Sequence, residues 1–125
     1  MNIPANLKFT KTDEWFDPVS GKIGLTDYAQ SQLSDIVFVE VVVAIGDELQ
    51  TGKPVASVES VKAAAESYAP VKAKVSAINE ELAKNPEVLN SDPYGKGWMI
   101  RVEEAETASL MDSAAYTKYC EERSH

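Results

Sequence analysis

Short stretches rich in β-branched residues follow one another at close intervals along this chain, with turn residues between them. Residues 15–17 and 22–25 flank the turn signal at residues 18–21, a pattern that predicts a β-hairpin. Residues 55–61 alternate between two faces, as the side chains of a strand do. Residues 36–45 are apolar apart from one glutamate, which predicts a strand buried on both faces for part of its length. The sequence therefore favours a mostly β fold.

Other segments complete this expected fold. Residues 68–78 and 98–102 are predicted to form further strands. A short helix is expected over residues 27–33, where Thr26 can act as the N-cap. A helical turn is expected over residues 79–84, and it should stop before Pro86, because proline disfavours helical backbone in the residue that precedes it.

The end of the chain changes character. Its apolar residues recur at helical spacing and are Leu110, Met111, Ala114, Ala115, Tyr116 and Tyr119. This spacing predicts one or two terminal helices packed on the sheet, with Cys120 as a half-buried hydrophobic residue. We expect a single domain over residues 1–125, with a β-rich body over about residues 1–106 and a C-terminal helical segment over about residues 107–122.

A weak internal repeat relates two parts of the chain at an offset of 33 residues. It aligns Leu49 with Leu82, and it aligns Gly46 with Asn79. Glycine and asparagine are the residues that best tolerate a left-handed backbone. If the repeat is structural, two similar β-units pair around a pseudo-twofold axis, and the segment between them, which holds Lys62, forms an exposed turn. The alternative is chance similarity, since valine and alanine are common here.

Charge and the scarcity of reactive side chains exclude several functions. The formal net charge of -8 argues against nucleic acid as a partner, because phosphate binding requires a basic face. The single cysteine is Cys120 and the single histidine is the terminal His125, so neither a zinc site nor a Ser-His or Cys-His pair is expected. No apolar run has the length of a membrane span, and no signal peptide is recognisable. A cytoplasmic location is therefore expected.

Lys62 is distinguished by its position and by its neighbours. It follows the alternating segment and precedes three alanines, so that small side chains leave its stem sterically open. A lysine presented in this way suits a ligase that forms an amide with a carboxylic acid, and acylation turns the side chain into a long tether. Tethering raises the effective concentration of a reactive group at successive docked sites. The alternative is an ordinary solvated lysine in a loop.

Several sequence blocks on both sides of Lys62 occur in the same order as the matching blocks of a known protein family. They are residues 14–15, 24–30, 35–40, 59–64, 68–71, 89–95, 97–99 and 116–122. The run Glu-Ser-Val-Lys-Ala that contains Lys62 is a specific signal, and its agreement with the flanking blocks argues against coincidence. In this order the chain resembles the glycine cleavage system H protein family over most of its length.

The resemblance implies a flattened, lipoyl-domain-like β-barrel and sandwich hybrid of two pseudo-twofold-related halves, with short helices and a C-terminal helix. It implies a non-catalytic carrier with lipoate on Lys62, as N6-lipoyllysine. The lipoyl arm would carry the aminomethyl group of glycine from the pyridoxal-phosphate-dependent glycine decarboxylase to the tetrahydrofolate-dependent aminomethyltransferase. Dihydrolipoamide dehydrogenase would reoxidise the arm, and a lipoate or octanoate ligase or transferase would attach it. A monomer is expected, without a metal, nucleic acid or membrane as partner.

By the same resemblance, the loaded arm can fold back into a cleft on the carrier. The matching positions are Thr12, Glu14 and Glu66. Carboxylates suit this role because they can hold a protonated aminomethyl group by charge-assisted hydrogen bonds. The alternative is that Glu14 and Glu66 are ordinary surface carboxylates.

Some residues depart from the family pattern. Asp13 stands where histidine is usual, and Ser34 stands where glycine is usual. Lys72 and Ala73 replace the usual Ser-Gly turn, and Glu66 replaces the commoner aspartate. None of these departures touches Lys62.

Three other functions remain open at this point. An H-like protein that relays lipoyl or octanoyl groups to other lipoate-dependent enzymes would carry the same motif. A biotin carrier shares the hairpin lysine, but methionines usually flank that lysine, whereas Val61 and Ala63 flank Lys62. A stand-alone enzyme would have to build its site from Trp15, Trp98 and carboxylates, and core packing is the better account of the tryptophans.

Overall fold

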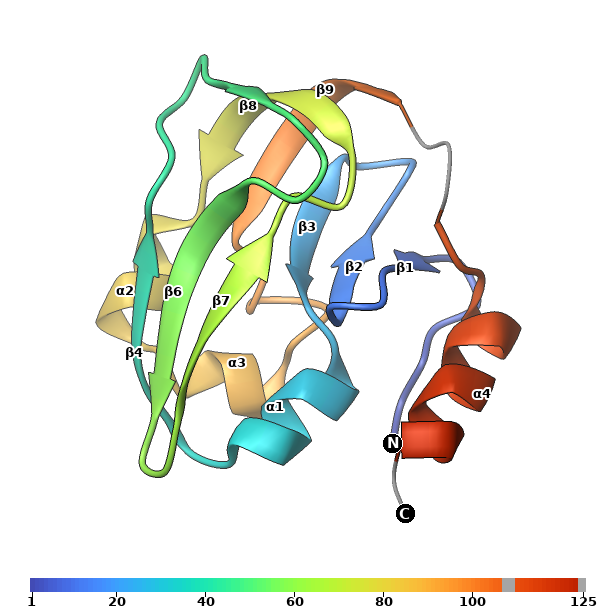
Figure 1. The fold of residues 1–125 in the computed structure, drawn as a ribbon. Coiled ribbons are helices and arrows are strands. Elements are labelled where there is room, and N and C mark those ends of the chain that lie inside the picture. The colour runs from blue at the N-terminus through green and yellow to red at the C-terminus, as the bar shows by residue number, and fades with distance from the viewer. Residues whose placement is uncertain (107–109, 124–125) are drawn as a thin grey trace.

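The computed structural model describes residues 1–106 and 110–123, which form strands and short helices (Figure 1). The strands are β1 (Lys8–Phe9), β2 (Glu14–Phe16), β3 (Lys22–Leu25), β4 (Ile36–Val41), β5 (Glu48–Leu49), β6 (Pro54–Ser60), β7 (Ala64–Tyr68), β8 (Lys72–Ile78) and β9 (Ile100–Glu106). The helices are α1 (Asp27–Leu33), α2 (Glu80–Lys84), α3 (Val88–Ser91) and α4 (Ser113–Arg123). None of the helices in these ranges is both long and apolar enough to cross a membrane.

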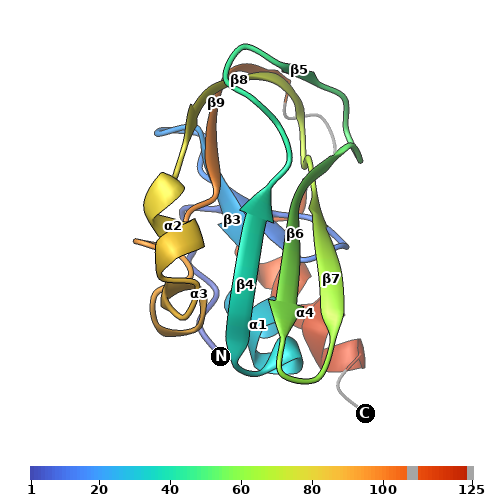
Figure 2. The same cartoon turned by 90° about the vertical axis from the view of Figure 1, so that its left-hand side faces the viewer.

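The strands form two antiparallel sheets, and the predicted mostly β fold with short helices is confirmed. Within the described residues, the larger sheet has the strand order β1-β2-β3-β9-β8-β5 and the smaller has the order β4-β6-β7. The smaller sheet lies against the larger one, and α1 and α3 lie near the end where β6 turns into β7 (Figures 1 and 2). Both sheets are open, so the molecule is a sandwich rather than a closed barrel.

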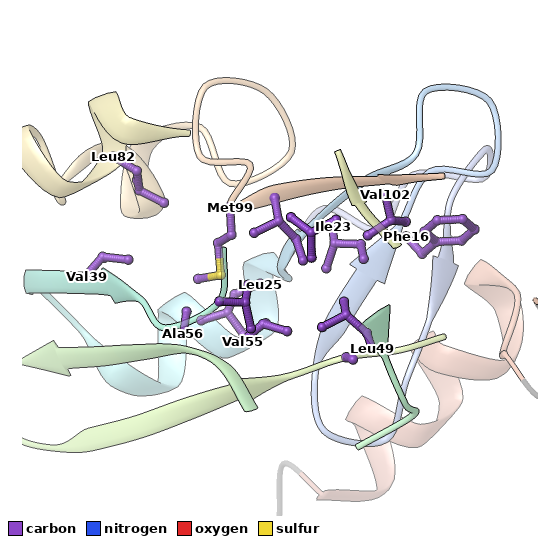
Figure 3. Close-up of a cluster of buried hydrophobic side chains, with 14 of the residues drawn as sticks. Phe16, Ile23, Leu25, Val39, Leu49, Val55, Ala56, Leu82, Met99 and Val102 are labelled. Carbon is purple, nitrogen blue, oxygen red and sulfur yellow. The ribbon is translucent and has the colours of Figure 1, made fainter. Parts of the chain in front are cut away.

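The hydrophobic core fills the space between the two sheets. Figure 3 shows Ile23 of the larger sheet and Val55 of the smaller sheet pointing toward one another, with Met99 beside them. All three side chains are inaccessible to solvent. Because strand side chains alternate between faces, slippage by one residue would turn such core residues outward, and the apolar pattern therefore fixes the register.

The predicted hairpin and first helix are confirmed. β2 pairs with β3, and Trp15 lies opposite Gly24. A side chain at Gly24 would meet the indole of Trp15 at 2.8 Å, so the ring requires glycine there. The Thr26 hydroxyl accepts a hydrogen bond from the Ala29 N–H at 3.1 Å and caps α1, as the sequence predicts. The predicted helical turn before Pro86 is also present, as α2.

The strand predicted over residues 36–45 is present but shorter, and the prediction that part of it is buried on both faces is wrong. β4 ends at Val41, and the side chains of Val37 and Phe38 are 54% and 44% exposed. β4 lies at the edge of the smaller sheet, and its register against β6 shifts between Ile36 and Phe38. The extra residue of this β-bulge bends the strand and turns apolar side chains outward.

Two other strand boundaries differ from the sequence prediction. Residues 68–78 contain the end of β7 and all of β8, which lie in different sheets. The chain crosses between the sheets at Pro70, which has no N–H to continue a ladder. The last strand, β9, begins at Ile100 rather than at residue 98, and α3 has no counterpart among the predicted elements.

The 33-residue repeat is wrong as a structural repeat. Leu49 lies in strand β5, whereas Leu82 lies in helix α2. Gly46 has a left-handed backbone with φ 95°, but the φ of Asn79 is -83°. The repeat therefore carries no information on the fold, and the pseudo-twofold relation between halves stays a prediction.

The predicted C-terminal helix is present as α4, although it begins later than expected. Residues 107–109 lie outside the described residues, and Met111 forms a bridge with Phe9 of β1. The ring of Tyr116 stacks on that of Phe9 at a centroid distance of 4.7 Å, and Cys120 is fully rather than half buried. The assignment of the chain to a single domain stays a prediction.

Replacing Ser34 by glycine is expected to stabilise the protein. Ser34 ends α1 with φ 67° and ψ -150°, a backbone conformation that is nearly restricted to glycine. Relief of this strain should raise the free energy of unfolding by about 1 kcal/mol, measured by chemical denaturation. The matched control is Ser31→Gly inside α1, which should lower it by about 0.5 kcal/mol. A decrease for both variants would contradict the strain at Ser34.

Candidate functional site

Lys62 lies in the turn between β6 and β7, at the end of the smaller sheet (Figures 1 and 2). The Ser60 N–H donates to the Ala63 carbonyl at 2.8 Å and closes the turn. The Ser60 hydroxyl accepts hydrogen bonds from the N–H groups of Ala63, at 3.0 Å, and Lys62, at 3.3 Å. The predicted exposed turn is therefore confirmed.

The surroundings of Lys62 leave its side chain open to solvent. Lys62 and the alanines that follow it at positions 63 and 64 are all exposed, and so is Val61. Within the described ranges the ion pairs are those of Lys84 with Glu81 and of Arg123 with Asp13, so neither involves Lys62. A soluble enzyme can therefore approach the ammonium group without displacing a partner.

Glu14 lies at the start of β2 and connects this strand with β7. Its Oε1 accepts hydrogen bonds from the hydroxyls of Thr10, at 2.6 Å, and of Thr12. Its Oε2 accepts a hydrogen bond from the N–H of Tyr68, at 3.1 Å. Glu14 is fully buried, whereas Thr12 is exposed, so Thr12 is the surface end of this group.

Burial changes the acid strength of Glu14. Desolvation raises the pKa of its carboxyl group from 4.5 to about 7, and the nearby charge of Asp13 adds to this increase. The hydrogen bonds from Thr10, Thr12 and Tyr68 favour the carboxylate and limit the increase. Near neutral pH the side chain therefore exists in both protonation states, and the alternative that Glu14 is an ordinary surface carboxylate is wrong.

Glu66 occupies a different position from Glu14. It is exposed on β7 and lies opposite Ser57 of β6. It precedes Tyr68 by two residues, so the side chains of Glu66 and Tyr68 lie on the same face of the strand. The described residues show no hydrogen bond or ion pair between Glu66 and Glu14. The structure thus brings Thr12 and Glu14 together, and their use as a cleft with Glu66 stays a prediction.

Sequence reasoning missed the residues that hold the turn before β2. Thr10, whose hydroxyl binds Glu14, is one of them, and the alternate spacing of Thr10, Thr12 and Glu14 is a signal that could have found it. Asp13 is another, and its carboxylate is held by two residues of α4. The Tyr116 hydroxyl donates to Asp13 Oδ1 at 2.8 Å, and the Arg123 guanidinium donates to both carboxylate oxygens.

The guanidinium of Arg123 also lies against two aromatic rings. Its central carbon is 4.0 Å from the ring centroid of Tyr119 and 4.4 Å from that of Tyr28. The planar guanidinium can donate two hydrogen bonds to Asp13 while its face lies against an aromatic ring, a combination that a lysine ammonium does not offer. Arg123 therefore fastens the C-terminal helix to the turn that carries Thr12 and Glu14.

Replacing Arg123 by alanine is expected to destabilise the protein by about 2 kcal/mol, because the half-buried Asp13 carboxylate loses its charged partner. Chemical denaturation at pH 7 measures the effect. The matched control is Lys84→Ala, which breaks the exposed pair with Glu81 and should cost about 0.5 kcal/mol or less. Equal losses for the two variants would show that Arg123 is an ordinary surface residue.

Comparisons with known proteins agree over nearly the whole chain. The family model described as "Glycine cleavage H-protein" matches residues 7–123. A glycine cleavage system H protein from Carboxydothermus hydrogenoformans is 48% identical, over 96% of this chain and 95% of its own. Another, from Nitratidesulfovibrio vulgaris, is 45% identical over the full length of both chains. The crystal structure of a glycine cleavage system H protein from Mycobacterium marinum is similar, with a TM-score of 0.84 and 26% identity, and covers 98% of this chain and 100% of that one.

Proposed function

The chain belongs to the glycine cleavage H-protein family, and from this premise we propose that Lys62 is the residue that carries its lipoyl group. The protein is a lipoyl carrier of the glycine cleavage system, and its lipoate is bound covalently to a lysine. When bound, lipoate supplies a dithiolane that can take up and release the aminomethyl group of glycine. The choice of Lys62 is supported by one observation above all, which is its exposure at the tip of a tight turn.

The residues around Lys62 suit the attachment of such an arm. The alanines at positions 63 and 64 present no bulk beside the ammonium group, and the Ser60 hydroxyl holds the backbone of the turn. Acylation removes the charge of the lysine without breaking an ion pair, because none holds it in the described residues. The fold therefore loses little when the side chain becomes a tether.

We include Thr12, Glu14 and Glu66 in the proposal, as the residues that receive the loaded end of the arm. The exposed hydroxyl of Thr12 and the exposed carboxylate of Glu66 are accessible to an incoming amine. Glu14 lies beneath Thr12 and can supply negative charge when it is ionised. An aminomethyl group is cationic when protonated, so these groups favour it electrostatically.

The partners of the protein, its oligomeric state and its location are part of the same proposal. We infer that the protein is not itself a catalyst, that it is a monomer, and that it works in the cytoplasm. It would dock in turn on glycine decarboxylase, aminomethyltransferase and dihydrolipoamide dehydrogenase, and a lipoate or octanoate ligase or transferase would load it. Its net charge of -8 favours docking on basic surfaces of these enzymes.

Glycine-dependent reduction of the arm tests the function. The lipoylated protein is incubated with glycine decarboxylase, pyridoxal phosphate and glycine, and new thiols are counted by alkylation and mass spectrometry. We expect thiols on the carrier when glycine is present and none when it is omitted. A fully lipoylated protein that gains no thiols with glycine would contradict the assignment and would favour a relay of lipoyl groups to other enzymes.

A further inference from the structure

One peptide group connects the Lys62 turn to a distant part of the chain. The peptide between Asp35 and Ile36 is trans, so its C=O and N–H point in opposite directions. The Asp35 carbonyl accepts a hydrogen bond from the N–H of Val61, the residue before Lys62, at 3.0 Å. The Ile36 N–H donates to Oδ1 of Asn90 at 2.9 Å. A single planar unit therefore joins the side chain of Asn90 to the backbone beside Lys62.

Asn90 is itself firmly placed. It lies in α3, directly after Leu89, which is fully buried in the core. Its Nδ2 donates to the Ser34 carbonyl at 2.8 Å and to Oε1 of Gln30 at 2.9 Å. The side-chain amide thus binds the backbone on both sides of Asp35. Its oxygen accepts from the Ile36 N–H, and its nitrogen donates to the Ser34 carbonyl and to the Gln30 side chain. Loss of this amide would remove the hydrogen-bond partner of the Ser34 carbonyl and that of the Ile36 N–H.

The Lys62 turn depends on such support because it has little packing of its own. Val61, Lys62 and Ala63 are all exposed, so hydrogen bonds rather than buried contacts decide its orientation. The bonds between Ser60 and Ala63, at 2.8 and 3.0 Å, close the turn on itself, and the bond from the Lys62 N–H to the Ser60 hydroxyl is longer, at 3.3 Å. These bonds fix the shape of the turn but not its direction relative to the rest of the protein, whereas the bond from the Val61 N–H to the Asp35 carbonyl ties the turn to a residue outside it.

We propose that Asn90 is a positioning residue that orients the Lys62 turn for acylation, through the Asp35–Ile36 peptide group. The inference rests on the proposed role of Lys62. An attacking amine must be held at the right distance and angle to its acyl donor, and small displacements reduce the rate strongly. Asn90 does not touch the acyl donor in this account. It restricts the backbone from which Lys62 extends.

The test compares Asn90→Ala with Asn79→Ala. Asn79 is a matched control because its side-chain amide also donates two hydrogen bonds, to the carbonyls of Lys96 and Trp98, each at 2.8 Å, and neither acceptor belongs to the Lys62 turn or to residues 34–36. Amide hydrogen exchange at Val61 and the rate of Lys62 acylation by a lipoate ligase, with lipoate and ATP, are measured for both. For N90A we expect about tenfold faster exchange at Val61 and about tenfold lower kcat for acylation, with KM for the carrier little changed. For N79A we expect both to match the wild type.

Unchanged Val61 exchange in folded N90A, or equal acylation rates for N90A and N79A, would overturn the proposal. If N90A does not fold, the isosteric Asn90→Asp variant decides. It keeps the acceptor for Ile36 but loses the donors to Ser34 and Gln30, so we expect changes of about threefold in both measurements. Wild-type values for N90D in both would overturn the proposal. If wild-type Lys62 is not acylated at all, the proposed function fails, whereas Val61 exchange still tests the connection to Asn90.

Discussion

Replacement of Lys62 by alanine is expected to leave the protein folded and to abolish both its lipoylation and its glycine-dependent reduction. The side chain is exposed and has no ion pair in the described residues, so its loss should change the free energy of unfolding by less than about 0.5 kcal/mol. Carrier function should disappear because no other atom of the turn can form the amide. Intact mass, thermal unfolding and thiol formation with glycine decarboxylase measure these effects.

Two control variants make the Lys62 result specific. Lys62→Arg keeps a positive charge but offers no primary amine, so it should fold normally and remain unmodified. Lys53→Ala removes another exposed lysine, in the turn before β6, and should keep full lipoylation and activity. Residual glycine-dependent thiols in the Lys62→Ala protein would contradict the proposal, because a second lysine would then carry the arm.

The stability of the protein is expected to depend on pH through Glu14. Its pKa is raised in the folded state, from 4.5 to about 7, so the folded protein binds a proton more tightly than the unfolded chain does. The resulting stabilisation is complete below about pH 4.5 and is lost as the pH rises through about 7. The full difference amounts to at most about 3 kcal/mol. Denaturation curves between pH 4.5 and 8 should therefore show this contribution decline.

The variant Glu14→Gln isolates this contribution, since an amide does not titrate in this range. We expect its free energy of unfolding to fall less with pH than that of the wild type. Glu66→Gln is the matched control, because Glu66 is exposed, and its pH dependence should follow the wild type. Parallel curves for the wild type and Glu14→Gln would contradict the raised pKa of Glu14.

Local signals in the sequence predicted the elements that local interactions determine. The hairpin of β2 and β3 and the cap of α1 by Thr26 depend on residues close together in the chain, and both are confirmed. The Lys62 turn is of the same kind, since Ser60 and its near neighbours close it. An edge strand with a bulge, such as β4, shows the same apolar run as a buried strand, and the sequence cannot distinguish them.

The contacts that support the candidate site join residues far apart in the chain. Arg123 and Asp13 are separated by 110 positions, and Asn90 and Ile36 by 54. No periodicity or turn signal relates such pairs, because tertiary packing alone brings them together. The burial of Glu14 could not be predicted for the same reason, since the Tyr68 N–H that binds it belongs to β7, 54 positions further along the chain. The sequence therefore pointed to Lys62 as the attachment site, but not to the contacts of Arg123 and Asn90 that support the candidate site.

The central claim is that one exposed lysine carries the lipoyl group, and peptide mapping of protein purified from its native host tests it most directly. The intact mass should exceed that of the bare chain by one lipoyl group. Tandem mass spectrometry after digestion should assign the added mass to Lys62 and to no other lysine. A native preparation whose lipoyl group lies on a different residue, or whose Lys62 is bare in actively growing cells while glycine is being cleaved, would contradict the account.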